Sequence, residues 1–267
     1  MPAQTKPREV ELKSTRRSAS EIMETVAKNG REELERSSHA LAFSGFAGGF
    51  AMGLTGLSVA VVRAALGHDP GSEFVAQLFY PMGFIAVVIG RAQLFTENTL
   101  YPVVLVFDNP RWIRNMLRLW AIVFASNVLG AFVFALIAER TSALTPKAAQ
   151  ELVILGTNAL TGNAAFFFWS GIIGGWLIAL VAWMVSASHF TIGQIAVVWL
   201  LTFVVGIGGF SHCIATSGEI LAAVVTGNLA PGMYFHWLLF ATLGNIIGGV
   251  TIVTLLNYGQ VHAGEHE

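Results

Sequence analysis

Residues 90–98, GRAQLFTEN, interrupt an apolar stretch that runs from about 76 to 107. A second apolar stretch, 192–225, is interrupted in the same manner by GIGGFSHC at 206–213. Each stretch is too long for a single membrane span, which takes about 20 helical residues. Irregular backbone survives in a bilayer only where it is buried in protein or lines a watery cavity, because unpaired amides cost several kcal/mol in lipid. We therefore expect two interrupted helices, each made of two half-helices joined by a loop at membrane depth.

Four uninterrupted apolar segments accompany the interrupted pair, so the sequence predicts six membrane spans. Each segment can cross a hydrocarbon core of roughly 30 Å as a helix. The expected fold class is therefore an all-α integral membrane protein with six transmembrane helices. The six spans are expected at about 39–63, 76–107, 116–138, 164–186, 192–225 and 234–257.

Charged residues are concentrated at the N-terminus. Residues 1–38 hold 15 of the 31 Lys, Arg, Asp and Glu residues, which leaves 16 for the other 229 positions. A soluble protein keeps a solvated exterior and cannot use so little charge, whereas a protein surrounded by lipid can. The formal charge of −1 offers no basic patch for nucleic acid, and the single Cys213 excludes an intrachain disulfide or a thiolate metal cluster. The sequence contains no hydrolase motif or phosphate-binding glycine loop, so we expect neither an enzyme nor a cofactor.

The sequence divides into a charged tail at 1–38, a membrane domain at 39–257 and a short tail at 258–267. Eleven Lys and Arg residues lie in the first tail and the 108–118 connection, against three in the connections on the other side. Positive residues favour the cytoplasmic side, so both termini are expected there. Segment 18–35 has apolar residues at helical spacing among charges, which predicts an amphipathic helix lying on the membrane surface.

The two halves of the sequence resemble each other. SGFAGGF at 44–50 matches SGIIGGW at 170–176, and NVLG at 127–130 matches NIIG at 245–248. A three-span unit reverses direction in its second copy, so the halves are expected to form an inverted 3+3 repeat. The paired interrupted helices then point to the substrate path. Close helix packing is the alternative explanation for the glycine pairs.

His212 lies inside an apolar span, at the second break. An ionisable side chain at membrane depth is expensive to keep, which favours a functional role over a structural one. The repeat alignment places Thr96 of the first break opposite His212, so we expect the Thr96 hydroxyl to orient the imidazole ring. His212 could then donate a hydrogen bond or a proton to an anion.

Apart from Arg63 and Arg118 at span ends, the Lys, Arg, Asp or Glu residues inside the expected spans are Arg91, Glu97 and Glu219, and these three lie beside the breaks. The half-helices that follow carry candidate caps, namely the threonines of 96–99 and a capping box at 216–219. Positive helix N-termini suit a small anion, although the two acids could act only as dipole partners. We expect Arg91 to pair with Glu97 across the first loop.

Four large side chains near the first break are candidates for apolar constrictions, which channels use to exclude hydrated ions. These are Tyr80, Phe84, Leu94 and Phe95. Aromatic side chains at helical spacing more often serve packing, so this alternative stays open.

Together these motifs resemble the formate/nitrite transporter family over about residues 20–257. The resemblance is carried by QLFT at 93–96, GFSHCIA at 209–215 and GIIGGWLIALVAWM at 171–184. It implies a homopentamer of aquaporin-like protomers in the bacterial inner membrane, each with its own pore. It also implies passage of small monovalent anions such as formate or nitrite, as weak acids or together with a proton.

The resemblance also implies roles for particular residues. His212 would be the central histidine, and the loop residues facing the pore would be Leu94, Phe95 and Thr96. The residues implied along the hydrophobic slits and the path are Tyr80, Phe84, Val205 and Phe210. The chain departs from the family at Gln93 and Ser211, where acids are usual, and at Arg91, where glycine is usual. This pattern is similar to a divergent branch labelled YfdC-like.

Two other functions are compatible with the residues. One is a channel for a neutral small solute, although the sequence lacks the paired Asn-Pro-Ala motifs of aquaporins. The other is a membrane scaffold or sensor that does not conduct, which the missing polar path residues leave open. Flux that depends on pH and saturates with formate or nitrite would favour the anion pore over both.

Overall fold

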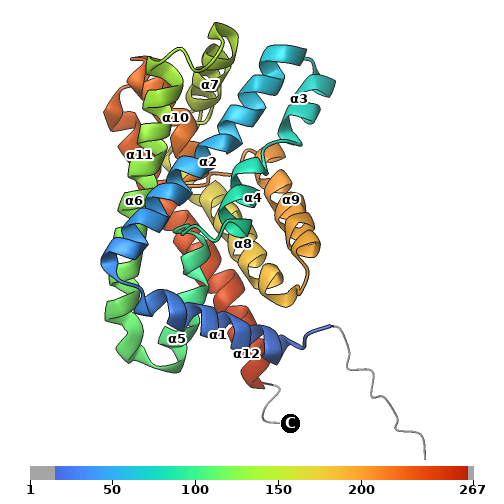
Figure 1. Cartoon of the computed structure of the whole chain (residues 1–267), viewed down its shortest axis with the longest axis vertical. Coiled ribbons are helices and arrows are strands. Elements are labelled where there is room, and N and C mark those ends of the chain that lie inside the picture. The colour runs from blue at the N-terminus through green and yellow to red at the C-terminus, as the bar shows by residue number, and fades with distance from the viewer. Residues whose placement is uncertain (1–15, 264–267) are drawn as a thin grey trace, which may run out of the picture.

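Helices account for every regular element in residues 16–263, the part of the chain that the computed structural model describes. The expected all-α class is therefore confirmed (Figure 1). Residues 1–15 and 264–267, which belong to the two predicted tails, lie outside the described part. The longer helices are α1 (Ala19–Glu35), α2 (Ser38–Leu66), α3 (Pro70–Gln77), α4 (Met82–Ile89), α5 (Tyr101–Asp108), α6 (Ile113–Arg140), α7 (Pro146–Asn158), α8 (Ala164–Ala187), α9 (Thr191–Ile207), α10 (Ala215–Val225), α11 (Pro231–Ile247) and α12 (Leu256–Ala263). Two short 3-10 turns are η1 (Glu97–Thr99) and η2 (Pro110–Trp112), and η3 (Gly248–Leu255) is a π-helical segment that joins α11 to α12.

Both expected interruptions are present. α4 ends at Ile89 and the next regular turn, η1, begins at Glu97. α9 ends at Ile207, and α10 begins at Ala215. The second halves of the two interrupted helices, α5 and α10, lie towards opposite ends of the molecule in Figure 1. The loops that precede them therefore approach the interior from opposite directions.

Five helical segments are long and apolar enough to cross a membrane. These are Ser38–Leu66, Pro70–Ile89, Pro110–Arg140, Ala164–Ala187 and Pro231–Ala263. The expected span 192–225 is divided between α9 and α10, which contain 17 and 11 residues. The last segment runs past its expected end at 257, so the predicted tail at 258–267 begins inside α12.

Large apolar side chains are exposed on the outer surface. Phe43, Trp169 and Ile192 are 79%, 65% and 75% exposed. Such surface is unfavourable in water, but it suits contact with lipid tails or with neighbouring copies of the chain.

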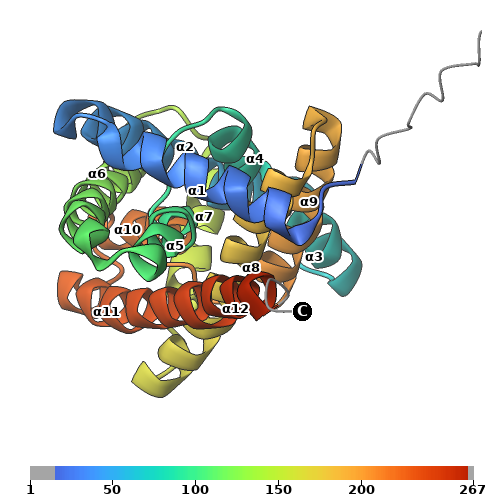
Figure 2. The same cartoon turned by 90° about the horizontal axis from the view of Figure 1, so that it is seen from below.

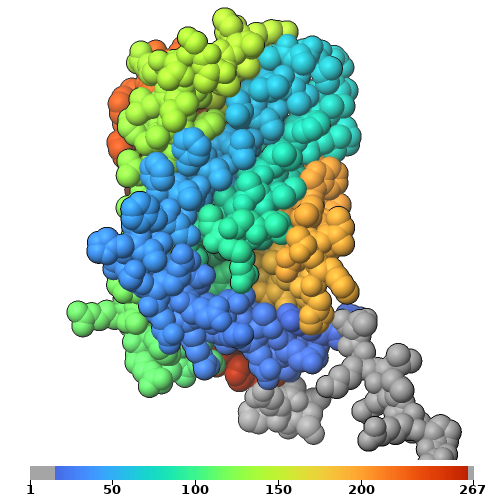
Figure 3. Space-filling view, in the orientation of Figure 1, coloured from blue at the N-terminus to red at the C-terminus, as the bar shows by residue number. Residues whose placement is uncertain are grey.

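α1 is the amphipathic helix that the sequence predicts, but protein covers its apolar face. The helix begins at a capping box in which Ser18 and Glu21 bond to each other's backbone, and these bonds hold the pKa of Glu21 below its usual range. Met23, Val26 and Leu34 are buried, and α1 packs on α5, α8 and α12. Figures 2 and 3 show α1 lying across the lower end of the bundle. The predicted place of this helix on the membrane surface stays a prediction.

Glycines allow two helix pairs to pack closely. A Cβ added at Gly49 of α2 would overlap the backbone oxygen of Asn127 on α6. A Cβ added at Gly175 of α8 would overlap the backbone oxygen of Asn245 on α11. The glycine pairs therefore do serve helix packing, the alternative that the sequence left open.

Replacement of Gly175 by alanine tests this packing. We expect Gly175→Ala to lower the free energy of unfolding by about 1–3 kcal/mol, because the rigid backbone of α11 must move to admit the methyl group. The measurement is thermal unfolding of the purified protein in lipid nanodiscs. Gly232→Ala is the control, since no atom lies within 4 Å of its added Cβ. Equal melting temperatures for the two variants would contradict the expectation.

Candidate functional site

Asn127 on α6 holds the first break in place with three hydrogen bonds. Its Nδ2 donates to the carbonyl oxygen of Gly45 at 2.6 Å and to that of Gln93 at 2.9 Å. Its Oδ1 accepts the backbone N–H of Phe95 at 2.9 Å. The asparagine is fully buried, so these bonds satisfy loop amides that water cannot reach.

Asn245 on α11 holds the second break in place with three equivalent hydrogen bonds. Its Nδ2 donates to the carbonyl oxygens of Gly171 at 2.7 Å and Ser211 at 2.9 Å. Its Oδ1 accepts the backbone N–H of Cys213 at 2.8 Å. The sequence marked both asparagines as parts of matching motifs but did not reveal this role. The signal that could have found it is their recurrence in Asn-x-x-Gly motifs at equivalent places in the two halves.

These bonds correct the alignment of the two breaks. The sequence comparison placed Thr96 opposite His212, whereas the asparagines bond Phe95 and Cys213 as equivalent residues. Thr96 and His212 therefore occupy different positions in their loops. They nevertheless meet, because the two loops approach the interior from opposite ends of the bundle (Figure 1).

His212 is fully buried and has a partner for each ring nitrogen. Nε2 lies 2.8 Å from the Thr96 hydroxyl, and Nδ1 accepts the backbone N–H of Ala215 at 3.0 Å. A backbone N–H can only donate, so Nδ1 carries no proton and the neutral ring carries its proton on Nε2. The Thr96 hydroxyl therefore accepts from Nε2, and the expected contact between Thr96 and His212 is confirmed. The Phe84 ring packs against the imidazole in a T-shaped arrangement, with 5.1 Å between ring centroids.

The start of α10 differs from the prediction of a capping box at 216–219. The helix begins at Ala215, and no side chain at the residue preceding it caps the helix. His212 supplies the acceptors instead: its Nδ1 takes the Ala215 N–H, and its carbonyl oxygen takes the Thr216 N–H at 3.2 Å. Residues 96–99 likewise provide no side-chain cap for η1, since the Thr99 hydroxyl donates to the Thr96 carbonyl oxygen. Both cap predictions are therefore wrong, because the loops place other acceptors at the helix starts.

A cavity opens at the end of the molecule that carries α1, and we call it the proximal vestibule. Its lining includes Glu33, Arg91, Gln93, Leu94, Glu97 and Tyr101. Arg91 has a φ of 58°, in the left-handed region that favours glycine. Arg91 and Glu97 share this cavity, but the ion pairs found in residues 16–263 do not include them. The predicted pair across the loop is thus not formed, and Arg91 faces the vestibule.

A second cavity lies at the opposite end, and we call it the distal vestibule. Its lining includes Arg63, Tyr80, Val205, Phe210, Thr216 and Glu219. One wall also comes from α7, a helix between two expected spans that the sequence analysis did not anticipate. Arg63 was counted there only as a charge outside the spans, so its place in this lining is a finding of the tertiary structure.

The hydrogen bond between Thr96 and His212 connects the loops of the two vestibules. Leu94 lines the proximal vestibule two residues before Thr96, and Phe210 lines the distal vestibule two residues before His212. Thr96 and His212 themselves are fully buried. The vestibules are thus separated by a short buried centre.

Most of the predicted site residues fall in one of these three places. Tyr80, Val205, Phe210 and Glu219 line the distal vestibule; Arg91, Leu94 and Glu97 line the proximal vestibule; Phe84, Thr96 and His212 form the buried centre. Phe95 is the exception, since neither lining includes it. Its ring packs on Trp120 and Phe124 of α6, with centroids 5.7 and 5.0 Å away.

Interrupted helices that meet at a buried polar pair between two vestibules define a helical membrane transport protein. The family model described as formate/nitrite transporter matches residues 20–259. The chain belongs to this family.

Known relatives agree with this assignment. Inner membrane protein YfdC of Escherichia coli is 33% identical over 243 residues, which cover 90% of this chain and 78% of that protein. A probable formate transporter of Methanothermobacter thermautotrophicus is 30% identical over 233 residues, covering 79% of this chain and 85% of the relative. A solved structure described as a pentameric formate channel with formate bound has the same fold. Its TM-score is 0.72 at 20% identity, covering 85% of this chain and 98% of that one.

Removal of the Asn127 amide should disrupt the first break. Each buried polar group left without a partner costs about 1–3 kcal/mol, so we expect Asn127→Ala to lose most of its folded protein. Size-exclusion chromatography and thermal unfolding in detergent measure the effect. Asn228→Ala is the matched control, because Asn228 is exposed and its side chain bonds only to nearby Thr226. Wild-type stability of Asn127→Ala would show that the loop does not depend on these bonds.

Proposed function

We propose that each protomer is a pore for a small monovalent anion or its weak acid, with His212 and Thr96 at its centre. The observation that carries the proposal is the hydrogen bond between these two residues, at the one place where the loops of both vestibules meet. Relatives described as a probable formate transporter, a formate channel and a nitrite transporter support the substrate class.

The buried centre favours a protonated substrate over a bare anion. Phe84, which packs on the His212 ring, is completely buried there and offers no charge to an anion. Burying an unpaired charge in apolar surroundings is far more costly than burying a neutral acid. The Nε2–H of His212 donates a hydrogen bond to the Thr96 hydroxyl, and an arriving carboxyl or nitrite oxygen could accept this bond instead. Passage of the neutral acid would carry one proton with each anion.

We further propose the six-span plan with an inverted 3+3 repeat. The matching bonds of Asn127 and Asn245 support it, as do the two interrupted helices. A repeat with an odd number of spans places the two halves in opposite orientations. α9 and α10 together would form the fifth span, since each is short for a full crossing.

A homopentamer in the bacterial inner membrane, with both termini in the cytoplasm, completes the proposal. The pentameric formate channel of the same fold supports the assembly, and YfdC, described as an inner membrane protein, supports the location. The excess of Lys and Arg on the side of the termini supports the orientation. The exposed apolar side chains of the outer surface would face lipid or neighbouring protomers.

Flux through proteoliposomes tests the pore. We expect wild-type protein to carry formate and nitrite in a saturable, pH-dependent manner. Thr96→Val removes the acceptor of the His212 proton and should lower this flux about tenfold, the equivalent of one hydrogen bond of about 1.4 kcal/mol. Thr96→Ser keeps the hydroxyl and is the control.

The same assay includes His212→Asn. Wild-type formate flux in His212→Asn would remove the central histidine from the proposal. Flux of urea or glycerol without formate flux would indicate the neutral-solute channel. No flux of any solute from correctly assembled protein would indicate a scaffold or sensor.

Two substitutions of Arg91 separate its expected effect on stability from its expected effect on anion preference. Arg91→Gly should relieve the left-handed backbone and raise the free energy of unfolding by about 1 kcal/mol. Arg91→Gln keeps the strained backbone and removes the charge. Both variants should lower the ratio of anion flux to neutral-solute flux, because a cation in the proximal vestibule attracts anions. An unchanged flux ratio in both variants would show that the charge of Arg91 does not influence selection.

A further inference from the structure

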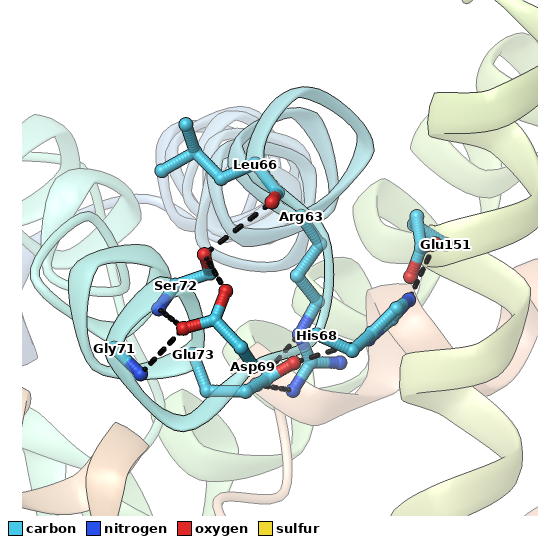
Figure 4. Close-up of polar contacts among 8 residues, drawn as sticks. All are labelled: Arg63, Leu66, His68, Asp69, Gly71, Ser72, Glu73 and Glu151. Atoms are coloured by element: carbon cyan, nitrogen blue, oxygen red, sulfur yellow. Dashed lines mark hydrogen bonds and ion pairs between the residues drawn. The ribbon is translucent and has the colours of Figure 1, made fainter.

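A chain of charged side chains lies beside the distal vestibule, and one of its members, Arg63, also lines that vestibule. Figure 4 shows it: Arg63 comes from α2, Glu73 from α3 and Glu151 from α7, with His68 of the α2–α3 connection in the middle. Contacts among these four residues join three helices at the end of the molecule away from α1. We call this set the distal cluster.

The contacts of the distal cluster are short and continuous. Arg63 donates to Glu73 Oε2 from Nε at 3.0 Å and from Nη2 at 2.6 Å. His68 Nδ1 lies 3.1 Å from Glu73 Oε1, and His68 Nε2 lies 2.9 Å from Glu151 Oε1. His68 therefore bridges two carboxylates with its two ring nitrogens.

This geometry determines the protonation of His68. An ionised carboxylate has no proton and only accepts hydrogen bonds, so both ring nitrogens must donate. Only the imidazolium form carries a proton on each nitrogen. A neutral ring would direct a lone pair at one of the two carboxylates. In agreement with this, the hydrogen bonds to Glu151 and Glu73 raise the pKa of His68 above its ordinary value.

Glu151 depends on His68 for a donor. Glu151 is only 5% exposed, and its second oxygen has no hydrogen-bond partner in the described part of the chain. A neutral His68 keeps one N–H and can donate to only one of Glu73 and Glu151, so loss of one proton removes one of the two links that bridge α3 and α7. Lys147, one turn away on α7, forms no ion pair with Glu151 in residues 16–263.

α7 connects the distal cluster to the wall of the distal vestibule. A Cβ added at Gly156 of α7 would overlap the backbone oxygen of Glu219 on α10, so the two helices are in close contact. Leu155 and Asn158 of α7 line the distal vestibule together with Arg63 and Glu219. The position of α7 therefore affects the width of this vestibule.

We propose that His68 is a proton-binding site that bridges α3 and α7 at the mouth of the distal vestibule, and that loss of its proton releases this bridge while α7 stays packed on α2 and α10. The charged groups around the site are Arg63 from α2, Asp69 and Glu73 from the start of α3, Glu151 and Lys147 from α7, and Glu219 from α10. With His68 protonated, the charges of the distal cluster cancel. Without the proton the cluster carries one net negative charge. This proposal concerns the contact between two helices and holds whether or not the pore passes anions.

The direction of the pH effect follows from the raised pKa. A histidine whose folded-state pKa exceeds its unfolded value stabilises the fold at acid pH. That contribution is lost as the pH rises through the folded-state pKa. The bridge between α3 and α7 through His68 is therefore stable at acid pH and becomes weaker as the pH rises.

Nuclear magnetic resonance of ¹⁵N-histidine-labelled protein in nanodiscs tests the site directly. The His68 signal is assigned by its absence in His68→Gln. We expect its titration midpoint to lie above about 6.5, the ordinary value for histidine. Glu151→Gln should lower the midpoint by about 1 unit, because one neighbouring charge is removed. A midpoint near the ordinary value that is the same in wild type and Glu151→Gln would overturn the proposal; if Glu151→Gln does not fold, Glu73→Gln replaces it in the comparison.

Hydrogen exchange of the α3 and α7 backbone amides tests the release. After correction for intrinsic rates, exchange should be at least about threefold faster at about pH 8.5 than at about pH 6, on either side of a raised histidine pKa. His68→Gln should show the faster rate at both pH values. His236→Gln, which replaces an exposed histidine of α11, should behave as wild type. Corrected rates in wild type that do not change with pH would overturn the release of this bridge.

Discussion

Broken helices inside an apolar bundle must have their backbone amides satisfied, and two buried asparagines meet this constraint. Asn127 and Asn245 each bond a helix carbonyl, a loop carbonyl and a loop N–H. Water cannot serve this purpose at membrane depth, so the loops keep their shape only while these amides are present. The positions of Thr96 and His212 depend on this support.

Close helix packing is what allows the asparagines to reach the loops. Gly49 lies against Asn127, and Gly175 lies against Asn245, where any larger residue would overlap backbone. Glycine at position 175 thus has a structural explanation in this chain, because α8 contacts the α11 backbone there. Packing and hydrogen bonding are therefore parts of one arrangement in each half of the molecule.

The few charges of the membrane domain are placed differently at the two ends. Arg91 lies in the proximal vestibule on strained backbone and forms no ion pair with another residue of 16–263. Arg63 in the distal vestibule is instead bonded to Glu73, within a cluster whose net charge depends on the proton of His68. The surroundings presented to an anion thus differ at the two entrances, and the distal one includes a histidine whose pKa is raised by its hydrogen bonds to Glu151 and Glu73.

The sequence by itself determined the helical class, the two interruptions, the amphipathic helix and the place of His212 at the second break, because these follow from apolar length and from the periodicity of apolar residues. Only the tertiary structure decided which atoms form hydrogen bonds with the backbone of the two loops. It aligned Phe95 with Cys213 and placed acceptors of His212, in place of the expected capping box, at the start of α10. It also covered the apolar face of α1 with protein and brought His68 into contact with Glu151. These contacts join residues far apart in the chain, and their geometry depends on how the helices pack, which local periodicity does not encode.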